Sequence, residues 1–243
     1  RLWHQTLRAK LVTDGWMQFE SDPGIFYRNH PKHGREYLGI YVDDLIHACA
    51  KPQAHDYFLK FCNKYFPTTT QGPLSWILGM EVKRDRKTRT LTINQTQAIL
   101  SFLEENNMRT ATPAPTPMIE TWQYGDGPPV EDKDKIKFYR SRVASINFFA
   151  QCTRPDLAYS VSQLSRHLAN PNTNCFAALN RAMKYLAGTP HLGIVYHTDD
   201  KTTLQLEAYA DASFGNEDAN GARSPQGHLI YFAGGIIDWK ANL

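Results

Sequence analysis

The spacing of hydrophobic and polar residues predicts alternating helices and strands in the N-terminal part of the chain. Leu2, Leu7 and Leu11 recur at the spacing of one helical face, and Asp14-Gly15 is a typical helix end. Short apolar runs bounded by turn residues predict strands further along. The predicted helices cover residues 1–15, 52–66 and 95–107, and the predicted strands lie within residues 21–29, 35–50 and 76–95. This mixture of elements predicts an α+β fold.

The pattern changes after residue 108. Residues 110–135 are rich in Pro, Gly, Thr and acidic residues without any period, which predicts a linker or a wrapping arm. Helices are predicted beyond it, with Pro155 at the start of one and Gly188 at the end of the next. From residue 202 the pattern alternates, which predicts a strand that ends at Asp211. Two more strands are expected around a Gly234-Gly235 turn.

The charge of the chain is unevenly distributed, although the formal net charge of its 243 residues is only +3. Residues 140–190 are basic and residues 195–220 are acidic, which suits a polyanionic partner together with a cation site. The alternative is that the basic and the acidic stretch are only solvent-exposed faces without a partner. The four cysteines form no CxxC pair, so we expect buried thiols in a reducing compartment. No stretch reaches the roughly 18–20 apolar residues of a membrane span, so we expect an intracellular protein without a membrane partner.

The segment GIYVDDLIHACA at residues 39–50 places two carboxylates, Asp43 and Asp44, inside an apolar run. An unpaired buried carboxylate is costly, so the pair would need a metal ion or a cationic partner. Strand alternation would send the two side chains to opposite faces, whereas a tight turn lets both approach one site. Adjacent carboxylates on a rigid hairpin suit two-metal phosphoryl transfer. An ordinary turn is the competing interpretation, because Asp is common in turns.

These segments together resemble the Pol polyprotein of copia-type retrotransposons. The YVDD segment at residues 41–44 resembles the Tyr-x-Asp-Asp box of reverse transcriptases, and the likeness runs nearly from end to end. The other matching segments are SDPGIF at 21–26, ILGMEV at 77–82, PTPM at 115–118, YRSRVASINFFAQCTRPDLAYSVSQLSR at 139–166, RAMKYLAGT at 181–189 and YADASFGN at 209–216. The ordered series is more specific than any single motif.

The resemblance implies a fold and an order of domains. Residues 1–108 would be the C-terminal part of a reverse transcriptase palm and the thumb, and residues 109–135 a Pro-rich linker. Residues 136–200 would be a helical connection, and residues 201–243 the opening antiparallel strands of an RNase H-like domain. The chain would then be a fragment, with a third polymerase carboxylate before it and further RNase H acids after it. We therefore expect the fragment alone to be inactive.

The resemblance also implies roles for individual residues. Asp43 and Asp44 would bind Mg²⁺ or Mn²⁺ for polymerisation, and Asp211 would be the first metal-binding catalytic carboxylate of the RNase H-like domain. The residues that would contact nucleic acid are Tyr41, Val42, Trp76, Gly79, Met80, Lys83 and Arg84. Each of them has a structural alternative, either as a packed strand residue or as part of a solvated loop. The implied substrates are an RNA template, a DNA primer, an RNA/DNA hybrid and deoxynucleoside triphosphates.

Two further features are expected to be structural. In the TRPD segment, Thr153 and Asp156 suit a helix N-terminus, and Arg154 could tie a helix to a sheet. Histidines such as His47 and His55 show no metal-ligand spacing and are expected to be packed or solvated. The resemblance implies a cytoplasmic particle and the nucleus as locations. The alternative function is that of a decayed or domesticated copy that binds nucleic acid or a partner without catalysis.

Overall fold

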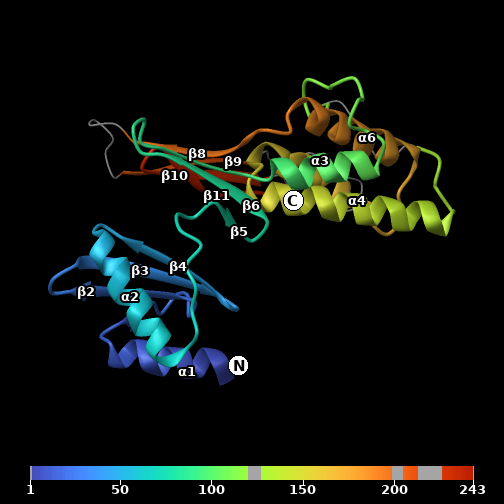
Figure 1. Cartoon of the computed structure of the whole chain (residues 1–243). Helices are drawn as coiled ribbons and strands as arrows, with labels where there is room; N and C mark the ends of the chain where they lie inside the picture. Colours follow the sequence, from blue (N-terminus) through green and yellow to red (C-terminus); the bar gives the residue numbers. More distant parts are fainter. Residues whose placement is uncertain (1, 120–126, 199–204, 213–225, 243) are drawn as a thin grey trace. The chain divides into compact units, whose positions relative to one another are not determined.

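The computed structural model describes residues 2–119, 127–198, 205–212 and 226–242. The chain forms two compact units, Arg1–Leu74 and Ser75–Leu243. Both units combine helices with antiparallel sheets, which confirms the predicted α+β class (Figure 1). The domain boundaries that the resemblance implies stay predictions.

The first unit is a four-stranded antiparallel sheet with two helices. Its elements are α1 (Leu2–Thr13), β1 (Met17–Gln18), β2 (Ile25–His30), β3 (Gly34–Tyr41), β4 (Asp44–Cys49) and α2 (Pro52–Tyr65). The strands follow one another in the order β1-β2-β3-β4. Phe26 and Leu38 are paired across β2 and β3, and they pack in one cluster with Leu7 of α1 and Phe58 of α2. Both helices therefore cover the sheet face that carries Phe26 and Leu38.

The second unit contains two antiparallel sheets and a group of helices. Its elements are β5 (Trp76–Ile77), β6 (Met80–Asp85), β7 (Thr90–Asn94), α3 (Thr96–Glu105), α4 (Lys133–Cys152), the 3₁₀ helix η1 (Pro155–Leu157), α5 (Ala158–Ser165), α6 (Thr173–Gly188), β8 (Gly193–His197), β9 (Leu206–Ala212), β10 (Gln226–Phe232) and β11 (Gly235–Asn242). One sheet has the order β5-β6-β7-β8 and the other has the order β11-β10-β9.

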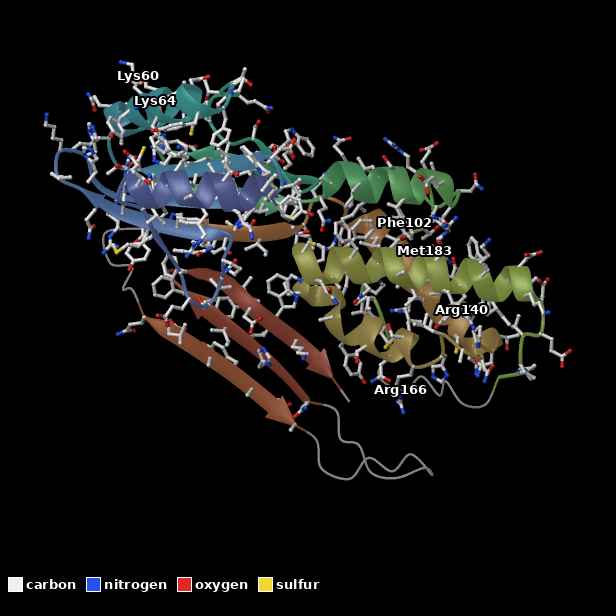
Figure 2. All side chains as sticks on the ribbon, turned by 90° about the horizontal axis from the view of Figure 1, so that it is seen from below. Lys60, Lys64, Phe102, Arg140, Arg166 and Met183 are labelled. Carbon is white, nitrogen blue, oxygen red and sulfur yellow. The ribbon has the colours of Figure 1, made fainter. Side chains whose placement is uncertain are left out.

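The helices of the second unit share one apolar core. On α4, Tyr139, Val143 and Ile146 lie on one face at helical spacing and are buried, as the pattern of such a helix requires. Phe102 of α3 and Met183 of α6 belong to the same cluster, and Figure 2 labels both. Burial of a large apolar side chain contributes about 1.5–3 kcal/mol, so this cluster is the main source of stability for the helical part.

Most predicted elements are confirmed, and several details differ, among them the end of β9, which extends one residue past Asp211 to Ala212. Strand β8 lies inside the stretch expected to be helical, because a five-residue strand gives too short a signal beside long helices. Helix α4 begins within the expected linker, where the Asp132 carboxylate caps it by accepting from the Asp134 and Lys135 amides. The last hairpin turns at Ala233-Gly234 rather than at Gly234-Gly235, since Phe232 pairs with Gly235.

None of the helices that the structure describes has the length and apolarity needed to cross a bilayer.

Candidate functional site

The acidic pair lies at a tight hairpin turn, as the sequence predicts. Strand β3 ends at Tyr41, and Tyr41 pairs with Asp44, the first residue of β4. Val42 and Asp43 therefore form a two-residue loop. Val42 has a φ of 53°, in the left-handed region that β-branched residues rarely enter. Such a backbone conformation costs on the order of 1–3 kcal/mol and persists only where its surroundings hold it in place.

Contacts on both sides fix this turn. The indole nitrogen Nε1 of Trp3, on α1, donates a hydrogen bond of 2.8 Å to the carbonyl oxygen of Val42. On the strand side, Ile40 pairs with Leu45, and both pack against the apolar core of the first unit. The loop is thus tied to a helix by a polar contact and to the core by the strands that flank it.

The two carboxylates are exposed to solvent, as are Tyr41 and Val42. The inference that burial forces the pair to find a compensating cation is therefore wrong, because the turn lifts both carboxylates out of the apolar layer. Exposure leaves the oxygens open to a ligand that comes from solution.

The described residues provide part of a metal site rather than a closed one. Among them, no group of three or more His, Cys, Asp or Glu side chains could hold a metal ion. Mg²⁺, however, is usually bound by one or two carboxylates together with water and substrate phosphates. Asp43 and Asp44 could supply the two carboxylate ligands of such a site on this hairpin, and water and substrate phosphates would supply the other ligands.

Asp211 lies in a different setting, near the end of β9 in the second unit. It pairs with Gly227 of β10, where an added Cβ would lie 3.3 Å from the Lys240 carbonyl oxygen. A surface depression of about 490 Å³ includes Asp211, and His228 and Lys240 also line it. His228 pairs with Ala210 and with Lys240, so its side chain lies on the opposite face of the sheet from Asp211, and its Nε2 is 2.9 Å from Asp238 Oδ2. Residues 213–216, the rest of the YADASFGN segment, lie outside the described residues.

The predicted nucleic-acid contacts on the second hairpin do not form one patch. Lys83 pairs with Thr92 and Arg84 with Leu91, so neighbouring residues on β6 point to opposite faces of the sheet. The Lys83 ammonium binds the Glu81 carboxylate at 3.0 Å, and this hydrogen bond lowers the pKa of Glu81. Both basic residues belong to strand β6 and not to a loop.

The remaining residues of this hairpin differ in exposure. Gly79 has a φ of 76° and occupies the two-residue loop between β5 and β6 together with Leu78. Trp76 is 51% exposed and Met80 is half-buried. Trp76 and Gly79 are therefore open to a partner, and Met80 is only partly so.

The TRPD segment has a structural role, in a form that differs from the expectation. Arg154 is fully buried and binds both carboxylate oxygens of Asp156, with Nη2 to Oδ2 at 2.7 Å. It also donates to the carbonyl and hydroxyl oxygens of Thr189 at the end of α6, both at 2.8 Å. Thr153 donates to the Gln95 side chain instead of capping a helix. The segment joins three helix ends, of α3, α4 and α6.

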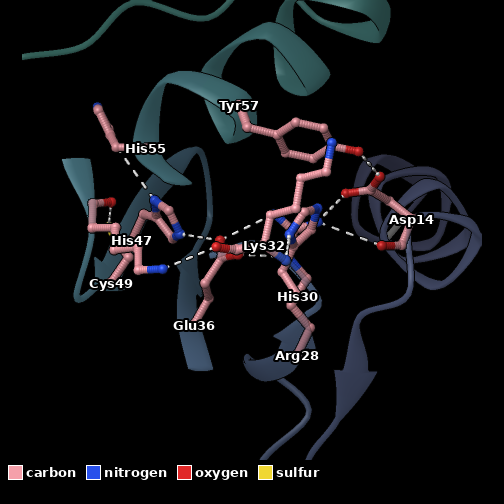
Figure 3. A network of polar contacts seen from close by, with 10 residues as sticks. Asp14, Arg28, His30, Lys32, Glu36, His47, Cys49, His55 and Tyr57 are labelled. Carbon is pink, nitrogen blue, oxygen red and sulfur yellow. Dashed lines mark hydrogen bonds and ion pairs between the residues drawn. The ribbon is translucent and has the colours of Figure 1, made fainter. Parts of the chain in front are cut away.

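A buried polar network in the first unit escaped the sequence analysis (Figure 3). Arg28 binds Asp14 and Glu36, with Nη2 to Glu36 Oε2 at 3.0 Å, and stacks on the Trp16 ring at 4.5 Å. His47 Nε2 lies 2.9 Å from the same Glu36 oxygen. The cross-strand register could have indicated this network, because Arg28 and Glu36 are direct partners on β2 and β3.

Burial sets the protonation state of His47. It lowers the pKa of the imidazole, and the hydrogen bond to Glu36 offsets that effect only in part. Neutral His47 must donate from Nε2 to the Glu36 carboxylate, so its Nδ1 accepts from Nδ1 of His55 at 3.3 Å. The expectation that His47 is a packed histidine is confirmed, and its partners give it a fixed tautomer.

Several known relatives of this chain match it along its whole length or nearly so. The "Retrovirus-related Pol polyprotein from transposon TNT 1-94" of Nicotiana tabacum is 30% identical over 249 residues, which cover 100% of this chain and 18% of that polyprotein. The "Retrovirus-related Pol polyprotein from transposon RE1" of Arabidopsis thaliana is 32% identical over 243 residues, 99% of this chain and 16% of that polyprotein. This chain thus spans less than a fifth of the length of either relative.

A shorter relative covers the same stretch. The "Putative transposon Ty5-1 protein YCL074W" of Saccharomyces cerevisiae is 27% identical over 241 residues, which cover 99% of this chain and 76% of that protein. No protein-family model and no solved structure matches the chain.

Proposed function

The homologues of this chain are retrovirus-related Pol polyproteins of copia-type transposons, and from this premise we propose that the chain is part of an RNA-directed DNA polymerase joined to an RNase H. In this proposal the first unit carries the end of the polymerase palm. The second unit carries the thumb, the helical connection and the opening strands of the RNase H-like domain. The substrates are an RNA template, a DNA primer, deoxynucleoside triphosphates and, for the RNase H, the RNA/DNA hybrid.

The exposed acidic turn is the observation that carries the polymerase proposal. Asp43 and Asp44 present adjacent carboxylates, Asp43 on the two-residue loop and Asp44 at the start of β4, and the loop backbone is fixed by Trp3 and by the flanking strands. In this role the carboxylates hold Mg²⁺ or Mn²⁺, with Asp43 as the more direct ligand, and orient the primer terminus. A divalent ion bound there would lower the pKa of the primer hydroxyl and stabilise charge on the phosphate. Tyr41 and Val42 lie beside the carboxylates and would line the primer end.

Asp211 carries the proposal for RNA cleavage. It is an exposed carboxylate near the end of a strand, and it lines a surface depression of about 490 Å³. We assign it as one ligand of a divalent cation in the RNase H-like domain. The exposed part of the hairpin at Trp76 and Gly79, with Lys83 and Arg84 on the following strand, would contact the nucleic acid backbone without reading its sequence.

Primer extension tests this proposal in the protein encoded by the complete reading frame that contains this chain. The wild type should extend a DNA primer on an RNA template with Mg²⁺, and Asp43→Asn should lower the rate by on the order of a hundredfold or more. The matched control is Asp56→Asn, at an exposed aspartate of α2, which should extend at the wild-type rate. Equal rates for Asp43→Asn and wild type would refute the metal role.

The two activities can be separated in the same preparation. Asp211→Asn should abolish cleavage of RNA in a labelled hybrid while it leaves primer extension intact, and Asp43→Asn should do the reverse. Loss of both activities in either variant would indicate damage to folding instead of loss of one metal site.

One observation favours a second candidate function. The yeast relative is a separate protein of which this chain covers 76%, so this stretch also occurs outside a long polyprotein. A non-catalytic nucleic-acid-binding remnant would suit that arrangement. It predicts binding of an RNA/DNA hybrid that weakens with salt, together with absence of primer extension by the wild type.

A further inference from the structure

The turn at Val42 has a conformation that its own sequence does not favour. Val42 has a φ of 53°, in a region that glycine and asparagine adopt readily and valine rarely adopts. In a two-residue hairpin loop, the carbonyl of the first loop residue also lacks a partner in the strand ladder. Something outside the hairpin must therefore hold this peptide in place if the following carboxylate is to have a fixed direction.

Trp3 supplies that contact from a distant part of the first unit. Its Nε1 donates to the Val42 carbonyl at 2.8 Å across 39 residues of sequence. The donated bond acts on the peptide group that links Val42 to Asp43. The direction in which the Asp43 side chain leaves the loop depends on the orientation of that peptide.

Trp3 is 38% exposed, and a contact with one aromatic ring orients its indole. Trp3, Leu7 and Leu11 follow one another every four residues on one face of α1, and Leu7 and Leu11 are fully buried. The Trp3 ring meets the Phe66 ring edge to face, with centroids 4.7 Å apart. Phe66 follows α2, and its amide donates to the Cys62 carbonyl at the end of that helix. Two helices therefore hold the indole that holds the turn.

We propose that Trp3 is a positioning residue, which fixes the peptide between Val42 and Asp43 so that the Asp43 carboxylate points in the direction that metal binding requires. This inference rests on the polymerase function proposed above. Trp3 does not touch substrate in this role, and its effect passes only through the Val42 carbonyl.

The experiment uses Trp3→Phe in the complete reading-frame protein. Phenylalanine keeps an aromatic ring against Phe66 and removes the N–H donor. The matched control is Trp239→Phe, which removes an indole hydrogen bond of the same kind, 2.7 Å to the Ala150 carbonyl, from the second unit. Circular dichroism and thermal unfolding establish that both variants fold.

The first measurement is amide hydrogen exchange at residues 42–44, without substrate. Trp3→Phe should speed exchange at these amides relative to wild type, while exchange at Leu38 in the same hairpin stays unchanged. Trp239→Phe should leave all of these amides unchanged. Unaltered exchange at residues 42–44 in Trp3→Phe would overturn the proposal, whatever the enzyme activity.

The second measurement is primer extension as a function of Mg²⁺ concentration. Trp3→Phe should lower kcat and raise the Mg²⁺ concentration for half-maximal rate, each by roughly two- to tenfold, with KM for template–primer unchanged. A wild-type rate and metal requirement would overturn the positioning role while the polymerase function stands. A wild type that makes no DNA would overturn the polymerase function, and the positioning role with it.

Discussion

At the scale of the residue, His47 shows how burial couples charge to stability. Its side chain is 3% exposed and lies between Glu36 and His55. Arg28 is the other charged group near it and disfavours the protonated imidazole. Burial is the largest cause of the lowered pKa, so the folded state favours the neutral ring. Protonation would place a second positive charge in a layer that already contains a buried guanidinium.

The stability of the first unit should therefore fall on acidification. An unfolded histidine has a pKa of 6.5, and the folded value lies below it, so the unfolded chain binds more protons as pH drops below 6.5. The free energy of unfolding should be at its full value above about pH 7 and decline towards pH 5, by no more than about 1.4 kcal/mol per pH unit for each such histidine. Urea unfolding followed by tryptophan fluorescence measures this decline.

A matched pair of variants isolates His47 from the other groups. His47→Gln keeps a donor for Glu36 and cannot be protonated, so its unfolding free energy should depend less steeply on pH. Some slope should remain, because burial also lowers the pKa of His30. His191→Gln, at an exposed position of the second unit, should leave the slope of the first unit unchanged. A slope in His47→Gln equal to that of wild type would contradict the account.

At the scale of the element, Arg154 joins helix ends that are distant in sequence. The C-terminus of α6 leaves carbonyl groups without intrahelical partners, and Arg154 donates to one of them, on Thr189. The Tyr185 hydroxyl completes the group by donating to Asp156 at 2.7 Å. A planar guanidinium can make all of these bonds at once, whereas a lysine ammonium cannot reproduce the paired geometry.

Arg154→Lys should therefore destabilise the second unit although it keeps the positive charge. The expected loss is about 1.5–3 kcal/mol of unfolding free energy, since hydrogen bonds to buried charged groups are lost. Thermal and urea unfolding measure it. Arg109→Lys is the control, because Arg109 and Glu104 form an exposed pair at 3.5 Å, and its effect should stay within about 0.5 kcal/mol. Similar losses in the two variants would argue against a special role for Arg154.

At the scale of the whole molecule, the chain is two units joined by an irregular segment. No helix or strand lies between the end of α2 at Tyr65 and the start of β5 at Trp76, and residues 69–76 are all exposed. Exposed backbone of this kind opens at little cost and is the preferred target of proteases. The two units should therefore separate by cleavage before either is degraded.

Limited proteolysis with subtilisin checks the two-unit division. The first cut should fall within residues 67–75 and yield two fragments that resist further digestion, as followed by mass spectrometry. Replacing Thr69 with Pro should slow that cut and should not alter cuts elsewhere. First cuts within α4 or β3, at rates equal to those in 67–75, would contradict the division.

Periodicity made much of this fold predictable, because local patterns report local elements. The spacing of Leu7 and Leu11 predicted α1, and the apolar runs on both sides of the acidic pair predicted the turn between β3 and β4. The pairing of β7 with β8 could not be predicted, since it joins residues about a hundred positions apart and leaves no local signal. The exposure of Asp43 and Asp44 also escaped prediction, because it depends on where the loop lifts the chain away from the core.

The β7–β8 pairing has a consequence for synthesis on the ribosome. Asn94 ends β7 and its partner Gly193 begins β8. The edge of β7 therefore stays unpaired until all the residues between Asn94 and Gly193 have been translated. At about 5–20 residues per second, that wait lasts roughly 5–20 s. During it, the β7 edge that β8 later covers has unpaired backbone groups, which makes the nascent chain prone to aggregation until β8 emerges.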